Sequence, residues 1–171
     1  DFTLDISTKD TILDNGFTLS KSLGDKPIVL AFYPADWSGG CTKEMCTMRD
    51  NFTELSQLNA LIVGISGDYP YSHREWAKHL ELPFSLLSDH KHEVAKLYNS
   101  FNEENNYNRR TVFIIDKQGI IVYIDLEYKA RDVASFNKLK DALEVILHQD
   151  QASLQAFVRK FKKEFTSLPV A

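Results

Sequence analysis

The sequence predicts an α/β protein in which helices flank a mixed β-sheet. Apolar runs suited to buried strands alternate with segments of helical periodicity, an order that is typical of parallel strand pairs. A later pair of apolar runs is joined only by Asp116-Lys117-Gln118-Gly119, and a connection this short requires an antiparallel hairpin. The chain of 171 residues is long enough for one domain with a substantial core.

Strands are expected where β-branched and aromatic residues form continuous apolar runs. The run from Ile28 to Tyr33 suits a central strand that is buried on both faces. Near the N-terminus, Asp14-Asn15-Gly16 predicts a tight turn, because Asn and Gly tolerate positive φ. The other predicted strands are 61–65, 84–87, 111–115 and 120–124.

Helices are expected where apolar residues recur at every third or fourth position. One helix is predicted to begin just before Cys41, and Pro83 ends a later one. The other predicted helices are 71–80, 92–98 and 133–147, the last with the inward stripe Val133, Phe136, Leu139, Leu143, Ile146 and Leu147. This order of elements is compatible with a thioredoxin-like fold.

Residues 149–171 are expected to be a C-terminal helical extension of the domain formed by residues 1–148. Apolar residues in this extension recur with helical spacing, and basic residues occupy the other side. One interpretation is a terminal helix packed on the domain with a solvated basic face. The other is a contact with a second subunit or a membrane surface. The apolar residues are Leu154, Phe157, Val158, Phe161 and Phe165.

The composition excludes several classes of protein. A net charge of −4 argues against nucleic acid as a partner, since phosphate binding needs a positive surface. No apolar run approaches the roughly 20 residues that cross a bilayer, so no membrane partner is expected. Two cysteines are too few for a secreted disulfide scaffold, and no signal peptide is recognisable, which favours a cytoplasmic location. The chain begins with Asp1, so a removed targeting segment stays an open alternative.

The segment from Phe32 to Asp50 contains both cysteines and is predicted to be a thiol redox site. Ser38 is a good N-cap residue, which places Cys41 in the first turn of the following helix. A thiol reacts as the thiolate, and the unpaired N–H groups and dipole at a helix N-terminus favour that form. The alternative is a buried, inert cysteine.

Cys46 follows Cys41 by five positions, and this spacing restricts what the pair can do. If both residues are helical, their axial separation is about 7.5 Å and their angular separation about 140°. A disulfide needs Cα atoms within roughly 7 Å and convergent Cβ vectors. Cys46 is therefore either a core residue, or the protein unfolds locally when the two thiols pair.

The cysteine segment resembles the active-site segment of peroxiredoxins, Pro-x-x-x-Thr/Ser-x-x-Cys. Pro34, Ser38 and Cys41 match this pattern in register, and Cys46 resembles the second cysteine of the PrxQ, or bacterioferritin-comigratory, subfamily. The resemblance extends over roughly residues 1–148. Other matching positions are Tyr33, Glu44, Lys26 to Leu30, Leu82 to Asp89 and Arg110 to Asp116.

The resemblance implies a thiol-dependent peroxidase that reduces hydrogen peroxide and organic hydroperoxides without a cofactor or metal. Cys41 is expected to be the nucleophile and to become a sulfenic acid, which Cys46 converts to an intramolecular disulfide. A thioredoxin-like dithiol is the expected reductant. Arg110 is expected beside Cys41, although the residues alone do not favour it over Arg109.

The remaining positions of the motif have supporting roles by the same resemblance. Ser38 is expected to hydrogen-bond the peroxide, Pro34 to shield the thiolate, and Tyr33 and Glu44 to line the substrate site. Three departures from the family pattern are the extension 149–171 beyond the usual end of the subfamily, Ser38 in place of the commoner Thr, and Trp37 in place of Phe. Because some relatives dimerise near the latter position, the expected state is a monomer or a weak homodimer.

Four other functions compete with this interpretation. A thiol–disulfide oxidoreductase would need Cys-x-x-Cys, whereas this chain has four residues between Cys41 and Cys46. A Cys–His hydrolase needs a histidine that nothing in the sequence places near the thiol. A non-enzymatic chaperone or binding module has only the C-terminal extension in its favour. A metal site would use histidines that are expected in exposed, polar stretches, namely His73, His79, His90 and His92.

Overall fold

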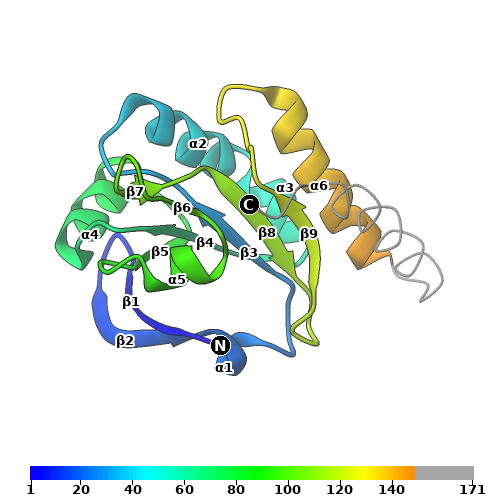
Figure 1. Cartoon of the computed structure of the whole chain (residues 1–171). Coiled ribbons are helices and arrows are strands. Elements are labelled where there is room, and N and C mark those ends of the chain that lie inside the picture. Colours follow the sequence, from blue (N-terminus) through cyan, green and yellow to red (C-terminus); the bar gives the residue numbers. More distant parts are fainter. Residues whose placement is uncertain (149–171) are drawn as a thin grey trace.

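A seven-stranded mixed sheet forms the centre of the computed structural model, which describes residues 1–148 (Figure 1). The strand order is β2-β1-β5-β4-β3-β8-β9. The strands are β1 (Thr3–Ser7), β2 (Ile12–Thr18), β3 (Ile28–Phe32), β4 (Leu61–Ser66), β5 (Ser85–Ser88), β8 (Thr111–Ile115) and β9 (Ile121–Asp125). A separate short hairpin pairs β6 (Phe101–Asn102) with β7 (Tyr107–Asn108).

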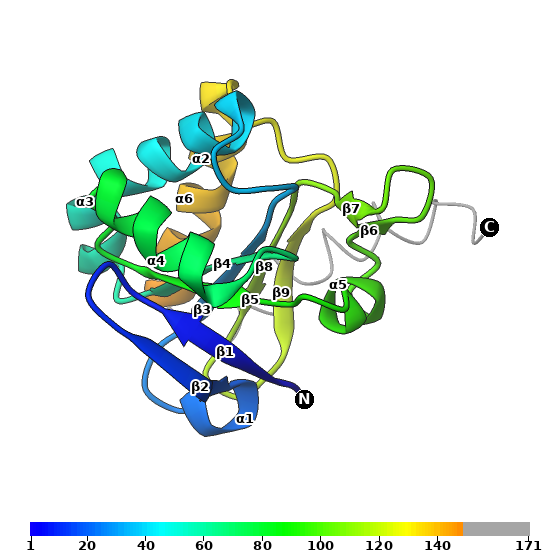
Figure 2. The same ribbon diagram turned by 90° about the vertical axis from the view of Figure 1, so that its left-hand side faces the viewer.

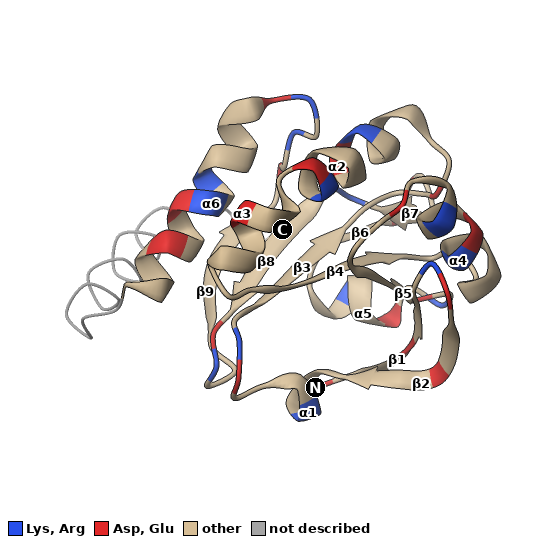
Figure 3. Cartoon of the chain, turned by 180° about the vertical axis from the view of Figure 1, so that it is seen from behind, with Lys and Arg blue, Asp and Glu red and all other residues tan. Residues whose placement is uncertain are grey.

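The helices connect and cover these strands. The two longest are α2 (Gly39–Asp50) and α6 (Val133–Leu147). The others are α1 (Leu19–Ser22), α3 (Phe52–Gln57), α4 (Pro70–His79) and α5 (Glu93–Leu97). None of the helices within residues 1–148 is long and apolar enough to cross a membrane. Figure 3 shows acidic and basic residues interspersed along α2, α4 and α6.

The pairing of the strands confirms the predicted mixed sheet. β3 pairs in parallel with β4, and β4 with β5, as the alternating helices require. β8 pairs antiparallel with β3 and with β9, which confirms the late hairpin. β3 is fully buried, as the continuous apolar run predicted.

Helices lie on both faces of the sheet (Figure 2), and an apolar cluster fills the space on each face. On one face, alternate residues of β3 pack with α2, α3, α4 and α6 in a core that includes Cys41 and Met45. On the other face, the remaining residues of β3 pack with α5, β6 and the N-terminal segment in a core that includes Phe32 and Phe113. The domain therefore has helices on both faces, as predicted.

The turn predicted at Asp14-Asn15-Gly16 is wrong, because these residues lie inside β2. Asn15 does have a positive φ of 49°, but it sits where the register of β1 and β2 shifts, between Leu4 and Ile6. Its backbone N–H donates to the Asp5 carboxylate at 2.8 Å. The same tolerance of positive φ that suits a turn here produces an irregularity within a strand pair. The reversal between the strands lies instead at 8–11.

The stripe predicted for α6 is only partly buried. Phe136, Leu139, Leu143 and Ile146 are in the core, whereas Val133 is 71% exposed and Leu147 is 43% exposed. Helical periodicity predicts which face turns inward, but not how far the sheet extends beneath the helix ends. The predicted extension 149–171 lies outside the described residues, so its separation from the domain stays a prediction.

Candidate active site

The N-terminus of α2 presents Cys41, as the sequence predicted. Ser38 is the N-cap, and its hydroxyl accepts a hydrogen bond from the Cys41 backbone N–H at 3.4 Å. The same hydroxyl donates to the Ala35 carbonyl at 3.2 Å, which orients the cap. Cys41 is buried in the first turn, where the backbone N–H groups of the helix end stabilise negative charge.

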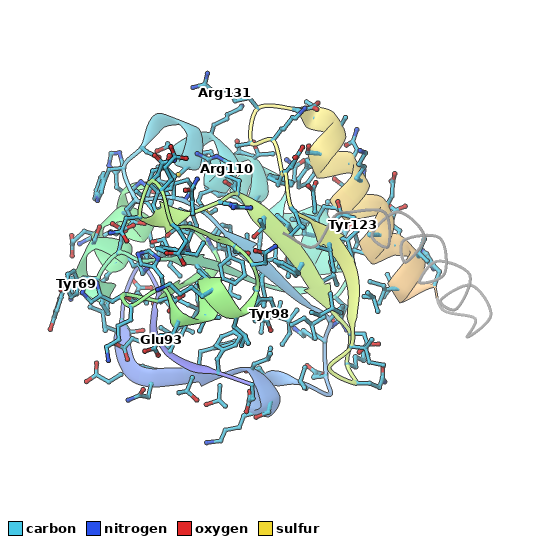
Figure 4. All side chains as sticks on the ribbon, viewed as in Figure 1. Tyr69, Glu93, Tyr98, Arg110, Tyr123 and Arg131 are labelled. Atoms are coloured by element: carbon cyan, nitrogen blue, oxygen red, sulfur yellow. The ribbon has the colours of Figure 1, made fainter. Side chains whose placement is uncertain are left out.

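Strand pairing brings Arg110 to this helix end from 69 residues away. β8 begins at Thr111, which pairs with Phe32 at the end of β3, just before the chain turns towards α2. From there, Arg110 Nη2 donates to Cys41 Sγ at 3.2 Å, and Figure 4 shows the arginine between α2 and β8. Arg109 is exposed, so the structure distinguishes between the two arginines.

Gly40 permits this close approach. A Cβ atom at that position would lie 2.6 Å from Arg110 Nη2, far inside van der Waals contact. Gly39 and Gly40 are adjacent at the start of α2. Only Gly40 serves this purpose, because a Cβ at Gly39 would meet no atom within 4 Å.

Glu44 lies one helical turn after Cys41 and is fully buried. Its Oε2 contacts Arg110 Nη1 at 2.6 Å, while its Oε1 has no hydrogen-bond partner among the described residues. Burial raises the pKa of Glu44 to about 7, although Arg110 opposes this change. Burial would lower the pKa of Arg110, but Glu44 and Cys41 together raise it above its usual value.

The three side chains form a unit that can stabilise a thiolate. Arg110 stays positively charged and directs one guanidinium nitrogen at the sulfur, while Glu44 holds the other nitrogen. A thiolate that accepts a charged hydrogen bond at a helix N-terminus is a nucleophile ready to attack an electrophilic atom. The described polar contacts place Glu44 on Arg110, so its predicted contact with substrate stays a prediction.

Cys46 lies in the same helix and is half-buried against the core on the α2 side of the sheet. Both cysteines are free thiols. Because α2 runs without interruption from Gly39 to Asp50, the helical separation of the two thiols predicted above applies to this structure.

Tyr33 and Pro34 begin the loop that connects β3 to α2. Tyr33 is fully buried, and its hydroxyl donates to Asp36 Oδ1 at 2.8 Å rather than facing the thiol. Pro34 is half-buried. The predicted roles of Tyr33 in substrate contact and of Pro34 in shielding stay predictions.

A buried polar cluster behind the loop was missed by the sequence analysis. Asp36 Oδ2 lies 2.9 Å from His73 Nδ1, and neither side chain is exposed. The expectation that His73 is exposed is therefore wrong. A signal was present, because His73, Trp76 and Leu80 recur at helical spacing and all turn towards the core.

Three further histidines have partners other than Cys41. His79 stacks on Trp37 with ring centroids 5.5 Å apart, and His90 bonds the Tyr69 hydroxyl at 2.8 Å. His92 bonds Asn108. Within residues 1–148, no three His, Cys, Asp or Glu side chains lie together as a metal site would require.

Comparisons with known proteins identify relatives of this chain. The family model described as "AhpC/TSA family" matches residues 1–124. A chloroplastic peroxiredoxin Q of Triticum aestivum is 42% identical over 108 residues, which are 63% of this chain and 49% of the wheat protein. Peroxiredoxin Bcp of Bacillus subtilis (strain 168) is 34% identical over 140 residues, covering 77% of this chain and 89% of that protein. This chain therefore spans about half the length of the wheat relative and most of the bacterial one.

Solved structures show the same architecture. The reduced 2-Cys peroxiredoxin of Plasmodium vivax matches with a TM-score of 0.72 at 25% identity. The match covers 84% of this chain and 91% of the Plasmodium chain. This likeness confirms the thioredoxin-like fold predicted from the order of the elements.

Proposed function

The chain belongs to the AhpC/TSA family, and on that premise we propose that it is a thiol-dependent peroxidase with Cys41 as its nucleophile. The single observation that carries the proposal is the 3.2 Å contact between Arg110 Nη2 and Cys41 Sγ at the capped end of α2. A cysteine held only as a core residue would not require a half-buried guanidinium directed at its sulfur.

In the first step, the Cys41 thiolate attacks one oxygen of a hydroperoxide. The S–O bond forms as the O–O bond breaks, so the sulfur is oxidised to a sulfenic acid and the peroxide is reduced. The leaving oxygen takes up a proton and departs as water or an alcohol. Arg110 stabilises the negative charge, which moves from the sulfur towards the leaving oxygen. Ser38 caps the same helix end through the Cys41 backbone N–H, and we propose that its hydroxyl also bonds the incoming peroxide.

In the second step, the Cys46 thiolate attacks the sulfenic sulfur of Cys41. An S–S bond forms, and the hydroxyl leaves as water after it gains a proton. This step requires α2 to unwind, because helical residues five positions apart stand about 7.5 Å apart along the axis. The product is an intramolecular disulfide.

A dithiol reductant then restores both thiols by thiol–disulfide exchange. Thioredoxin-like proteins have this chemistry, so we place one as the partner of the oxidised form. Hydrogen peroxide and organic hydroperoxides are the substrate class. A monomer or weak homodimer is the proposed state, and sedimentation over a range of concentrations tests it.

Stopped-flow mixing with peroxide tests the proposed function on three proteins. The wild type should consume peroxide repeatedly when a dithiol is present. Cys41→Ser should consume none, because Cys46, the other cysteine of the chain, is not the thiol that Arg110 contacts. Peroxide turnover by the Cys41→Ser variant at the wild-type rate would reject the proposal.

A further inference from the structure

The loop 34–38 is attached to α4 by the polar cluster that surrounds Asp36. We name this set the Asp36 cluster; its members are Tyr33, Asp36, Ser72 and His73. The Asp36 carboxylate accepts hydrogen bonds from the Tyr33 hydroxyl at 2.8 Å and from the Ser72 hydroxyl at 2.8 Å. Its two oxygens lie 2.9 and 3.1 Å from His73 Nδ1. All four residues belong to elements other than α2.

The chemistry of each partner fixes the donor and acceptor roles in this cluster. His73 Nε2 lies 3.2 Å from the Leu87 carbonyl oxygen, which can only accept, so this nitrogen carries a hydrogen. His73 Nδ1 lies within hydrogen-bond distance of both oxygens of the Asp36 carboxylate. Burial and the Asp36 charge raise the pKa of Tyr33 well above its usual value, so its hydroxyl remains a donor. Every oxygen of the buried carboxylate therefore has a hydrogen-bond donor.

Further contacts attach the backbone of the same loop. The Asp36 backbone N–H donates to the Asp68 carboxylate at 2.8 Å. Trp37 has a positive φ of 63°, an unfavourable conformation for a bulky residue. Its indole N–H donates to the Ser72 hydroxyl at 3.2 Å. Such strain persists only where neighbouring groups hold the backbone in place.

The loop leads directly into the reactive end of α2. Ser38, the cap that bonds the Cys41 N–H, is two residues beyond Asp36. Opening of this first turn is the movement that brings Cys46 within reach of Cys41. Attachment of the loop to α4 therefore opposes the opening and favours the peroxide-reactive geometry.

We propose that Asp36 and His73 are positioning residues that hold the loop 34–38 on α4 and thereby set the balance between the closed and the opened first turn of α2. The loop attachment is a property of the fold. The kinetic consequence rests on the proposed function: the attachment speeds the reaction with peroxide and slows closure of the Cys41–Cys46 disulfide.

Two substitutions of His73 distinguish a role in holding Asp36 from a role in packing alone. Asn places its amide nitrogen close to the position of Nδ1, whereas Gln places its amide nitrogen close to that of Nε2. His73→Asn therefore retains a donor towards Asp36, and His73→Gln does not. Asp36→Asn removes the carboxylate itself. Ser7→Ala is the matched control, because it deletes a buried 2.9 Å hydrogen bond to the Pro70 carbonyl at the start of α4 without touching the cluster.

The experiment measures three rates on the full chain. Hydrogen exchange of the Asp36 and Cys41 backbone N–H groups reports loop opening without any peroxide. Stopped-flow mixing gives the peroxide step, and the appearance of disulfide gives the closure step.

In Asp36→Asn and His73→Gln we expect exchange and closure to be faster and the peroxide step slower. Each change is expected to be about tenfold or more, as follows from losing a hydrogen bond to a charged group. All three rates of His73→Asn should be closer to the wild-type rates than those of His73→Gln. The control Ser7→Ala should change each of the three rates by less than about twofold.

The proposal is overturned if hydrogen exchange is unchanged in Asp36→Asn and His73→Gln. It is also overturned if His73→Asn and His73→Gln have equal effects. A decrease in both the peroxide rate and the closure rate would also overturn the proposal, because it would indicate a general disruption of the structure. If the wild type fails to react with peroxide while the exchange pattern follows expectation, the peroxidase proposal fails and the loop attachment stands. If peroxide reacts and exchange does not respond, the loop attachment fails alone.

Discussion

Replacing Arg110 with Met removes the guanidinium from the thiol while keeping a long side chain. The lost interaction is one charged hydrogen bond, at 3.2 Å, from Nη2 to Cys41 Sγ. Such a bond contributes about 1.5–3 kcal/mol, which corresponds to a decrease of about 10- to 150-fold in the rate constant of the peroxide step. Reduction of the disulfide should change much less, because Arg110 acts on the thiolate and the leaving oxygen.

The protonation state of Glu44 decides whether the Arg110→Met variant still folds. Without Arg110, nothing opposes the effect of burial, so the pKa of Glu44 should rise further and its carboxyl should be neutral at pH 7. The protein then avoids a buried unpaired charge and should remain folded. The double variant Arg110→Met/Glu44→Gln should therefore react with peroxide at nearly the rate of the single variant.

Stopped-flow rate constants at several peroxide concentrations measure the effect. Arg109→Met is the control, because this neighbouring arginine is exposed and has no described contact with the thiol. The reasoning is refuted if Arg110→Met and Arg109→Met react equally fast. It is also refuted if the peroxide step and the reductive step slow by the same factor.

Three other substitutions test separate parts of the site. Cys46→Ser should react once with peroxide and then accumulate oxidised Cys41, which mass spectrometry detects; an unchanged steady state with dithiol would exclude Cys46 from the cycle. Gly40→Ala should slow the peroxide step, because its Cβ would lie 2.6 Å from Arg110 Nη2, and a wild-type rate would show that the arginine position is unimportant. For Glu44, the folded pKa of about 7 exceeds the ordinary glutamate value of 4.5, so the folded state binds the extra proton and stability falls as pH rises through this interval. Glu44→Gln should remove up to about 3 kcal/mol of that pH dependence, as measured by urea unfolding, and a wild-type slope in the variant would disprove the assignment.

Local patterns in the sequence determined the secondary structure around the site. The apolar run of β3 and the Ser38 cap act on residues within one turn or one strand, so they could be recognised without knowledge of the fold. The position of Cys41 in the first turn of α2 follows from the same cap. The Asn15-Gly16 error shows the limit of such signals, since positive φ suits both a turn and a strand irregularity, and only the partner strand decides between them.

Contacts between distant parts of the chain decided the chemistry of the site. Arg110 rather than Arg109 meets Cys41 because the pairing of β8 with β3 sets which residue stands at the helix end. The burial of Glu44 and the pairing of Asp36 with His73, 37 residues apart, likewise depend on how the helices pack on the sheet. The sequence by itself therefore determined where the thiol stands on its helix. The tertiary structure alone decided which charges surround it, because charge pairing over such separations depends on packing and not on neighbouring residues.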